Sequence, residues 1–269
     1  MTLRLDYFFA FLRHKTLFAQ LVRREVAGRY RGSLLGVFWA FATPLLMLSV
    51  YAFVFVGVFA MRWPGAEAAG GTVYVLQLFT GLIVFNFFSE VVSRSPFQVL
   101  EQPNLVKRVV FPLELLAQVS LSAALVHLAI SAAILLGALI FTTGLSPQAV
   151  FAPLALLPLL LMALGLSWLL SALGVYARDL GQFIGLLVSL LLFLSPVFYS
   201  LERLPESIRR WMSFNPLTLP IENLRRCLFP GSEAMDWRAW AVSLAVGVFV
   251  MWLGASVFAR TRDGFSDVI

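Results

Sequence analysis

Cysteine and charge are both scarce in this sequence. Cys227 is the single cysteine among 269 residues, so an internal disulfide and a paired-cysteine metal site are excluded. Charged residues make up 13% of the chain, whereas soluble globular domains carry about 25%. Apolar residues reach 60%, and the mean hydropathy is +0.89. Because a soluble fold of this length cannot hide so much apolar surface, we predict an integral membrane protein.

Motifs for nucleotide binding and catalysis are also missing. The sequence contains no G-x-x-x-x-G-K-[ST] phosphate loop, no cluster of metal ligands and no plausible nucleophile–base pair. We therefore expect no cofactor on this chain and no enzymatic activity of its own. A membrane glycosyltransferase would need paired acids in a cytoplasmic loop, where acids such as Glu101 and Asp179 are sparse. A passive scaffold is a further alternative.

Polar residues inside the apolar stretches are few. No chain of carboxylates crosses them and no inverted repeat is visible, which disfavours a proton-coupled transporter. His127 stands alone in an apolar stretch, and we expect it to hydrogen-bond to a neighbouring helix. Glu90 and Glu114 lie near the ends of such stretches, with Arg94 and Arg108 as expected partners.

Six apolar stretches are long enough to cross about 30 Å of hydrocarbon. They cover residues 34–60, 73–93, 110–141, 149–176, 182–199 and 237–259. The predicted fold class is an all-α membrane protein with six transmembrane helices in one domain, residues 1–269. Pro147, Pro153 and Pro158 predict a fourth helix that is kinked or begins late, and Ser195-Pro196 predicts a break after the fifth.

Residues 200–236 differ from the apolar stretches on either side. Five arginines, five acids and four prolines are interleaved there with apolar side chains. We interpret the segment as two short amphipathic helices broken near Asn215-Pro216. They would lie at the membrane interface or dip into the protein as a re-entrant pair.

The distribution of basic residues predicts the orientation. With the N-terminus inside, 13 of the 20 Lys and Arg fall in inner segments; six of the other seven lie in or beside residues 200–236. Both termini should therefore face the cytoplasm. The first 33 residues are basic and amphipathic, so we expect no cleaved signal. The net charge of +6 is better explained by anionic lipid than by nucleic acid.

Residues 16–32 predict an amphipathic helix on the inner membrane face. Arg23, Arg24 and Arg31 lie opposite the apolar side, and Arg29 is spaced i,i+4 from Glu25, so these two can pair. The simpler interpretation is an anchor to anionic lipid. The alternatives are a docking surface or a site for a negatively charged lipid headgroup.

The inner loop 95–108 is too apolar for a solvated linker. Phe97, Leu100 and Val99 would form one face of a short helix bounded by Pro96 and Pro103. Such a face is expected to be buried, either against the chain's own helices or against a partner subunit.

Several sequence blocks resemble one known family. They are RREVAGRYRGSLLGVFW at 23–39, PLLM at 44–47, NFFS at 86–89, NLVKRVVFPLE at 104–114, YARD at 176–179, PVFY at 196–199 and Asn215-Pro216. In this order they resemble the transmembrane permease subunits of polysaccharide ABC exporters (type-2 ABC exporters). The O-antigen (lipopolysaccharide) export permeases are most similar, with capsule and teichoic acid permeases as relatives; a lipid or drug exporter is a further alternative.

The resemblance implies a homodimer in the bacterial inner membrane with two copies of an ABC ATPase subunit, which holds ATP and Mg. The implied substrate is a glycan on undecaprenyl pyrophosphate. By the same resemblance, helix 16–32 is the interface helix, 95–108 the coupling helix and 200–236 the periplasmic gate. The residues assigned to these roles are Arg23, Arg24, Arg29 and Arg31 for the lipid pyrophosphate, Phe97, Leu100, Glu101 and Asn104 for the ATPase contact, and Trp211, Phe214, Asn215 and Pro216 for the gate.

Overall fold

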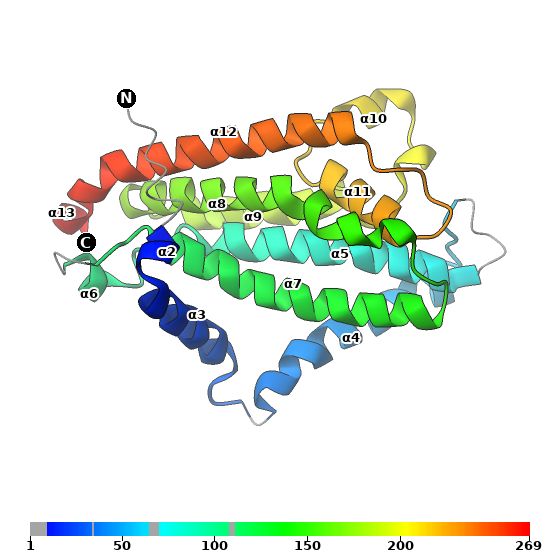
Figure 1. The fold of residues 1–269 in the computed structure, drawn as a ribbon, viewed down its shortest axis with the longest axis horizontal. Coiled ribbons are helices and arrows are strands. Elements are labelled where there is room, and N and C mark those ends of the chain that lie inside the picture. Colours follow the sequence, from blue (N-terminus) through cyan, green and yellow to red (C-terminus); the bar gives the residue numbers. More distant parts are fainter. Residues whose placement is uncertain (1–9, 34, 65–69, 108–110) are drawn as a thin grey trace.

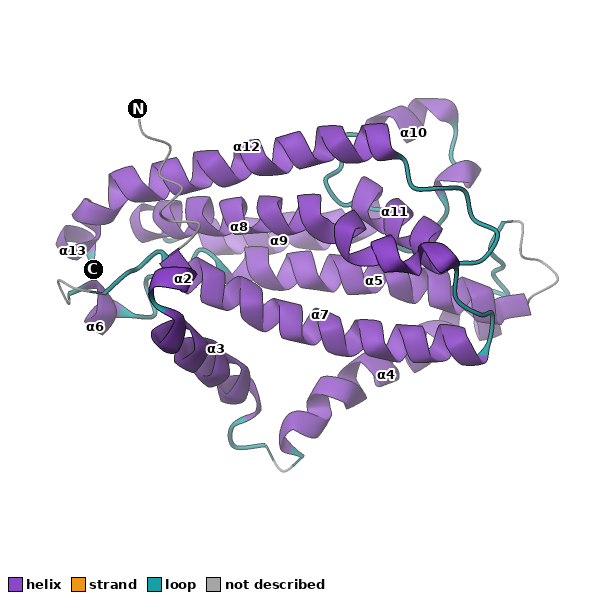
Figure 2. Cartoon of the chain, in the orientation of Figure 1, coloured by secondary structure: helices purple, strands orange, loops and turns teal. Residues whose placement is uncertain are grey.

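The computed structural model describes residues 10–33, 35–64, 70–107 and 111–269, which form helices, turns and loops but no strand (Figures 1 and 2). Leu34 and Val110, where two predicted spans begin, and Arg108, where the predicted coupling loop ends, lie outside these residues. The α-helices are α2 (Ala10–Arg13), α3 (Lys15–Tyr30), α4 (Trp39–Tyr51), α5 (Gly70–Arg94), α6 (Pro103–Val106), α7 (Leu115–Phe141), α8 (Ala152–Tyr176), α9 (Leu180–Leu194), α10 (Glu206–Met212), α11 (Thr218–Leu228), α12 (Trp237–Thr261) and α13 (Phe265–Val268). Short 3₁₀ turns are η1 (Gly36–Phe38), η4 (Pro147–Phe151), η5 (Leu201–Arg203) and η6 (Arg262–Gly264), and η2 (Ala52–Val58) is a π-helix.

Within the residues that the structure describes, five helical stretches are long and apolar enough to cross a membrane: Trp39–Val58, Gly71–Arg94, Leu115–Phe141, Pro147–Tyr176 and Trp237–Val268. They correspond to the first four predicted spans and the last. The predicted span 182–199 is helical only as far as Leu194, where α9 ends. Ser195 has extended backbone angles, because the residue before a proline is disfavoured in the helical region.

The prolines act as the sequence predicts. The fourth span begins as the 3₁₀ turn η4 and becomes α-helical from Ala152, with Pro158 inside α8. Residues 200–236 form two short helices, α10 and α11, and the break between them contains Asn215-Pro216.

Helices α8 and α12 pack through glycine. A Cβ added to Gly254 would lie 1.9 Å from the carbonyl oxygen of Gly165, and one added to Gly165 would lie 2.5 Å from the backbone of Met251. The two helix backbones therefore touch where only glycine fits, as small residues allow in membrane helix pairs.

The long helices run side by side, and α5 is the most enclosed of the candidate spans (Figure 1). Helices α3 and α4 diverge from this bundle, whereas η2 packs against α5. Ala40 is the one buried residue among Trp39–Val58, so most of this stretch is uncovered. Helix α9 also exposes large apolar side chains, including Phe183, Leu186 and Phe193. These surfaces require lipid or another protein chain to cover them.

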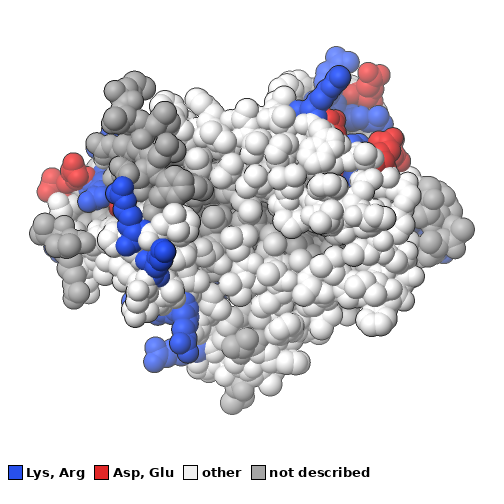
Figure 3. Space-filling model, in the orientation of Figure 1, with Lys and Arg blue, Asp and Glu red and all other residues white. Residues whose placement is uncertain are grey.

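The bundle has two polar ends. The α3 end gathers α2, α3, α6 and α13; the α11 end gathers α10, α11 and the start of α5 (Figure 1). In the view of Figure 3 the charged side chains lie toward these ends, and the surface between them carries almost no charged residue. This arrangement matches the requirement of a bilayer for an apolar band between two wet surfaces.

The prediction of a helix between Pro96 and Pro103 is wrong. Residues 95–101 form turns, and the short helix α6 begins only at Pro103. Proline has no N–H with which to continue a preceding turn, but it suits the first position of a new helix. The buried apolar residue of the loop is Val99, whereas Phe97 is exposed and Leu100 is half-buried.

Candidate functional site

Four residues join α3 to the bundle; we call them the Arg29 cluster (Arg29, Tyr30, Glu90 and His127). Arg29 Nη1 lies 2.5 Å from Glu90 Oε1, and His127 Nδ1 lies 3.0 Å from Glu90 Oε2. The Tyr30 hydroxyl is 2.9 Å from His127 Nε2. Burial raises the pKa of Tyr30, so its hydroxyl stays protonated and can donate to Nε2. The other ring nitrogen is then free to donate to Glu90.

A second ion pair lies beside the Arg29 cluster. Glu25 on α3 pairs with Arg94 on α5. Residues 25 and 29, about one turn apart on α3, therefore pair with residues 94 and 90, about one turn apart on α5. Arg29 and Glu25 are themselves 3.9 Å apart, as predicted from their spacing. Glu90 therefore binds across to α3 rather than to Arg94, and Glu114 pairs with Arg262 at 3.1 Å. As predicted, His127 bonds to neighbouring helices, to Tyr30 on α3 and to Glu90 on α5.

The arginines assigned to the lipid pyrophosphate are placed differently from one another. Arg23, Arg24 and Arg31 are exposed, whereas Arg29 is half-buried in its cluster. Arg24 also lines a small pocket of about 40 Å³ together with Arg94 and Glu101. The structure thus brings the basic helix and the predicted coupling segment together at one point.

The predicted coupling segment, residues 95–108, is bonded to α8. Gln98 Nε2 donates to Ser167 Oγ at 2.8 Å and to Ser171 Oγ at 2.6 Å. A Cβ on Gly174 would lie 2.2 Å from the carbonyl oxygen of Pro96. The side chains of Phe97, Glu101 and Asn104 remain exposed.

At the α11 end, Arg225 forms a contact that we call the Arg225 clamp. Its Nε and Nη2 donate to the carbonyl oxygen of Gln77 at 3.1 and 3.0 Å, and Nη2 also donates to the carbonyl of Val197 at 3.0 Å. Nη1 pairs with Glu222 at 2.9 Å, and the guanidinium lies 4.6 Å from the centroid of the Trp63 ring. Charged side chains are rarely fully buried. Arg225 can be only 3% exposed because its N–H groups have these hydrogen-bond partners.

Gly81 makes room for the clamp. A Cβ at this position would lie 3.0 Å from Val197 Cα and 3.1 Å from Arg225 Nη2. The clamp therefore joins α5, the break after α9 and α11 at one point.

The predicted gate residues occupy the break between α10 and α11 and its approach. Asn215 Nδ2 donates to the carbonyl of Leu194 at 2.9 Å and to Ser195 Oγ at 3.0 Å, so it fastens the break to the end of α9. Trp211 and Phe214 are 77% and 80% exposed, with ring centroids 6.2 Å apart. Pro216 is half-buried.

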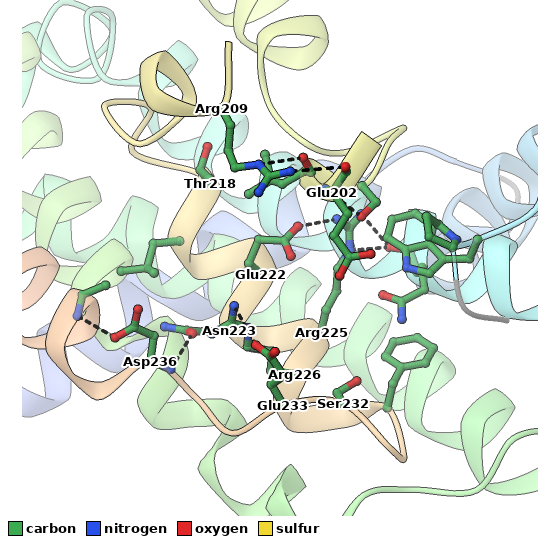
Figure 4. A pocket seen from close by; sticks show the side chains of 18 of the residues that line it. Glu202, Arg209, Thr218, Glu222, Asn223, Arg225, Arg226, Ser232, Glu233 and Asp236 are labelled. Carbon is green, nitrogen blue, oxygen red and sulfur yellow. Dashed lines mark hydrogen bonds and ion pairs between the residues drawn. The ribbon is translucent and has the colours of Figure 1, made fainter. Parts of the chain in front are cut away.

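A cavity of about 1830 Å³ lies at the α11 end (Figure 4). Most of its polar lining comes from α11 and the chain on either side of it, including Thr218, Glu222, Asn223, Arg226 and Glu233. The described residues contain no group of three His, Cys, Asp or Glu side chains able to hold a metal ion. Cys227 is buried, and burial raises the pKa of its thiol.

Apolar helices between two charged ends define a membrane protein with several spans. Residues 16–229 match the ABC-2 type transporter family, which is well over half of the chain. The chain belongs to the ABC-2 type transporter family.

Related proteins match this chain over all or most of its length. The chain is 23% identical to the O-antigen export system permease protein RfbA of Klebsiella pneumoniae over all of both chains. It is 27% identical to the protein of the same name from Myxococcus xanthus, covering 95% of this chain and 96% of the relative. It is 24% identical to the polysialic acid transport protein KpsM of Escherichia coli, covering 90% and 92%. The resemblance inferred from the sequence blocks is thereby confirmed.

Sequence reasoning missed the Arg225 clamp and the full Arg29 cluster. Arg225 is one of five arginines in its segment and carries no distinguishing pattern, because two of its partners are main-chain carbonyls. For the Arg29 cluster the sequence did contain a signal. Glu90 and His127 are rare polar residues in apolar stretches, and such residues usually pair with one another.

Proposed function

We propose that this chain is the channel-forming permease subunit of an ATP-driven exporter of a lipid-linked polysaccharide of the O-antigen type. The observation that carries the proposal is the similarity to O-antigen export permeases over the whole chain. Support also comes from the apolar band between two charged ends. The substrate that we propose is a glycan on undecaprenyl pyrophosphate, moved across the bacterial inner membrane.

The assembly that we propose contains two copies of this chain and two ABC ATPase subunits, which bind ATP and Mg. The uncovered apolar surfaces of α4 and α9 are available to lipid and to the second copy. In this arrangement α9 and residues 195–199 form the sixth span, the α3 end with both termini faces the cytoplasm, and α10–α11 form a re-entrant gate on the outer side.

The ATPase would contact the exposed side of the coupling segment. Phe97, Leu100, Glu101 and Asn104 are the proposed contact residues. Because Gln98 fixes this segment to α8, a push on the segment would be transmitted to the α8–α12 pair.

The pyrophosphate of the lipid carrier would bind the basic face of α3. Arg23, Arg24 and Arg31 are exposed there, and arginine suits phosphate recognition. Arg29, paired with Glu90, would take part only by exchanging partners. Charge reversal of Arg24 and Arg31 should stop export while the protein still assembles with its ATPase; unchanged export would refute this site.

The function itself is tested by deleting the gene. Gel analysis should show loss of surface polysaccharide together with accumulation of lipid-linked glycan inside the cell. Unchanged surface glycan would refute the proposal. Capsular polysaccharide is the second candidate substrate because the polysialic acid transport protein is similar over most of the chain, and the chemical class of the lost glycan separates the two.

A further inference from the structure

The cavity at the α11 end, which we call the α11 cavity, is large and combines polar side chains with apolar surface. Its volume of about 1830 Å³ exceeds the roughly 300–1,000 Å³ of pockets for small ligands. Its walls come from α5, α8, α10, α11, α12 and the connecting loops. The space is therefore sufficient for several sugar rings rather than for a single small molecule.

Two oxygen atoms in the wall residues have no hydrogen-bond partner. They are Gln77 Oε1 and Thr218 Oγ1, whose residues are 6% and 7% exposed. A buried polar atom without a partner is costly, and folded proteins rarely tolerate it. Both residues border the α11 cavity, so a rotation of either side chain would let hydroxyl groups of a ligand supply the missing partners.

The arginines that line the α11 cavity already have partners. Arg225 pairs with Glu222, Arg226 lies 3.6 Å from Glu233, and Arg209 donates to the carbonyls of Leu201 and Glu202 at 3.2 Å. The carboxylates among the lining residues are Glu202, Glu222, Glu233 and Asp236, against the three guanidinium groups. An anionic ligand would thus meet paired arginines and an excess of carboxylates (Figure 4).

We infer that the α11 cavity binds sugar rings of the exported glycan, and that this glycan is uncharged; the inference rests on the proposed function. Gln77 and Thr218 hydrogen-bond to sugar hydroxyls, and the carboxylates accept further hydroxyl protons. Phe214 borders the cavity with its ring exposed and offers an aromatic face to the C–H edges of a sugar.

The test replaces the two side chains that carry the unpartnered oxygens with apolar ones of similar size. Gln77→Leu and Thr218→Val are combined in the full chain, expressed with its ATPase in a deletion strain, and appearance of pulse-labelled surface glycan is followed. We expect export at least tenfold slower, while the thermal midpoint of the purified protein stays the same or rises. Thr80→Val is the matched control: Thr80 is buried on α5, bonds to its own helix at Leu76, and does not border the cavity.

The possible outcomes are distinct. Wild-type export rates in the double variant would overturn the inference, whereas a deletion strain with normal surface glycan would overturn the proposed function itself. If the double variant is unstable, a photo-crosslinking residue at Leu219, which borders the cavity, decides: a glycan adduct there and none at Leu136 supports the inference, and a phospholipid adduct alone refutes it. A carboxylate or phosphate in every repeat of the isolated glycan would refute the uncharged class.

Discussion

The two ends of the bundle hold their peripheral segments by different means. At the α3 end, side chains pair with side chains: Glu25 with Arg94, and Arg29 with Glu90. At the α11 end, Arg225 binds the main-chain carbonyls of Gln77 and Val197. Charge pairs on partly exposed helices can exchange partners, whereas a buried guanidinium on carbonyls has one arrangement. The α3 end is therefore suited to respond to ligands, and the α11 end to hold one geometry.

The largest effect should come from removing the Arg225 clamp. Arg225→Leu leaves the Glu222 carboxylate and two carbonyls without their partner, and we expect a loss of about 3–5 kcal/mol of stability. Thermal unfolding of the purified protein measures it. Arg225→Lys should retain only part of the stability lost in Arg225→Leu, because one ammonium cannot reproduce the guanidinium geometry. Arg210→Ala is the control, since that side chain is exposed; equal losses from both changes would contradict the clamp.

Filling the space at Gly81 should have the next largest effect. The Cβ of Gly81→Ala would press on Val197 and Arg225, and overpacking of this kind costs about 1–3 kcal/mol. Gly185→Ala provides the comparison, because nothing lies within 4 Å of a Cβ added there. A thermal midpoint for Gly81→Ala as high as that for Gly185→Ala would show that the clamp tolerates displacement.

At the α3 end, a charge swap should restore what single changes remove. Glu25→Arg or Arg94→Glu alone should cost about 0.5–1 kcal/mol, since both side chains are partly exposed. The double swap re-forms an ion pair and should recover most of that loss in a double-mutant cycle. Additive losses would mean that the Glu25–Arg94 pair does not hold α3.

The smallest effect on stability should accompany a large effect on function. Glu101→Lys changes an exposed side chain on the coupling segment, so thermal unfolding should be unchanged while export falls and ATP hydrolysis continues. Gln98→Leu should give the opposite signature, a less stable protein, because it removes the bonds to Ser167 and Ser171. Normal export with Glu101→Lys would count against the coupling role.

Much of the fold could be predicted because the membrane imposes it. Long apolar stretches predicted the candidate spans. Pro196 marked the C-terminal end of α9, and Pro216 marked the break before α11. The turns at 95–101 could not be foreseen, because the bonds of Gln98 to α8 depend on tertiary packing. The Arg225 clamp was equally hidden, since main-chain carbonyls leave no trace in a sequence. The roles assigned to individual arginines and gate residues stay predictions.

The shortness of α9 has a consequence for the surrounding lipid. Its 15 residues extend about 22 Å at 1.5 Å per residue, about 8 Å less than the hydrocarbon thickness of a typical bilayer. In the proposed sixth span, residues 195–199 would therefore lie at hydrocarbon depth, or the bilayer would thin beside them. Asn215 and Arg225 meet this same stretch, so acyl-chain length would act directly on the segment that they hold in place. Membrane thickness would thus be a physical variable of the proposed gate, separate from any ligand.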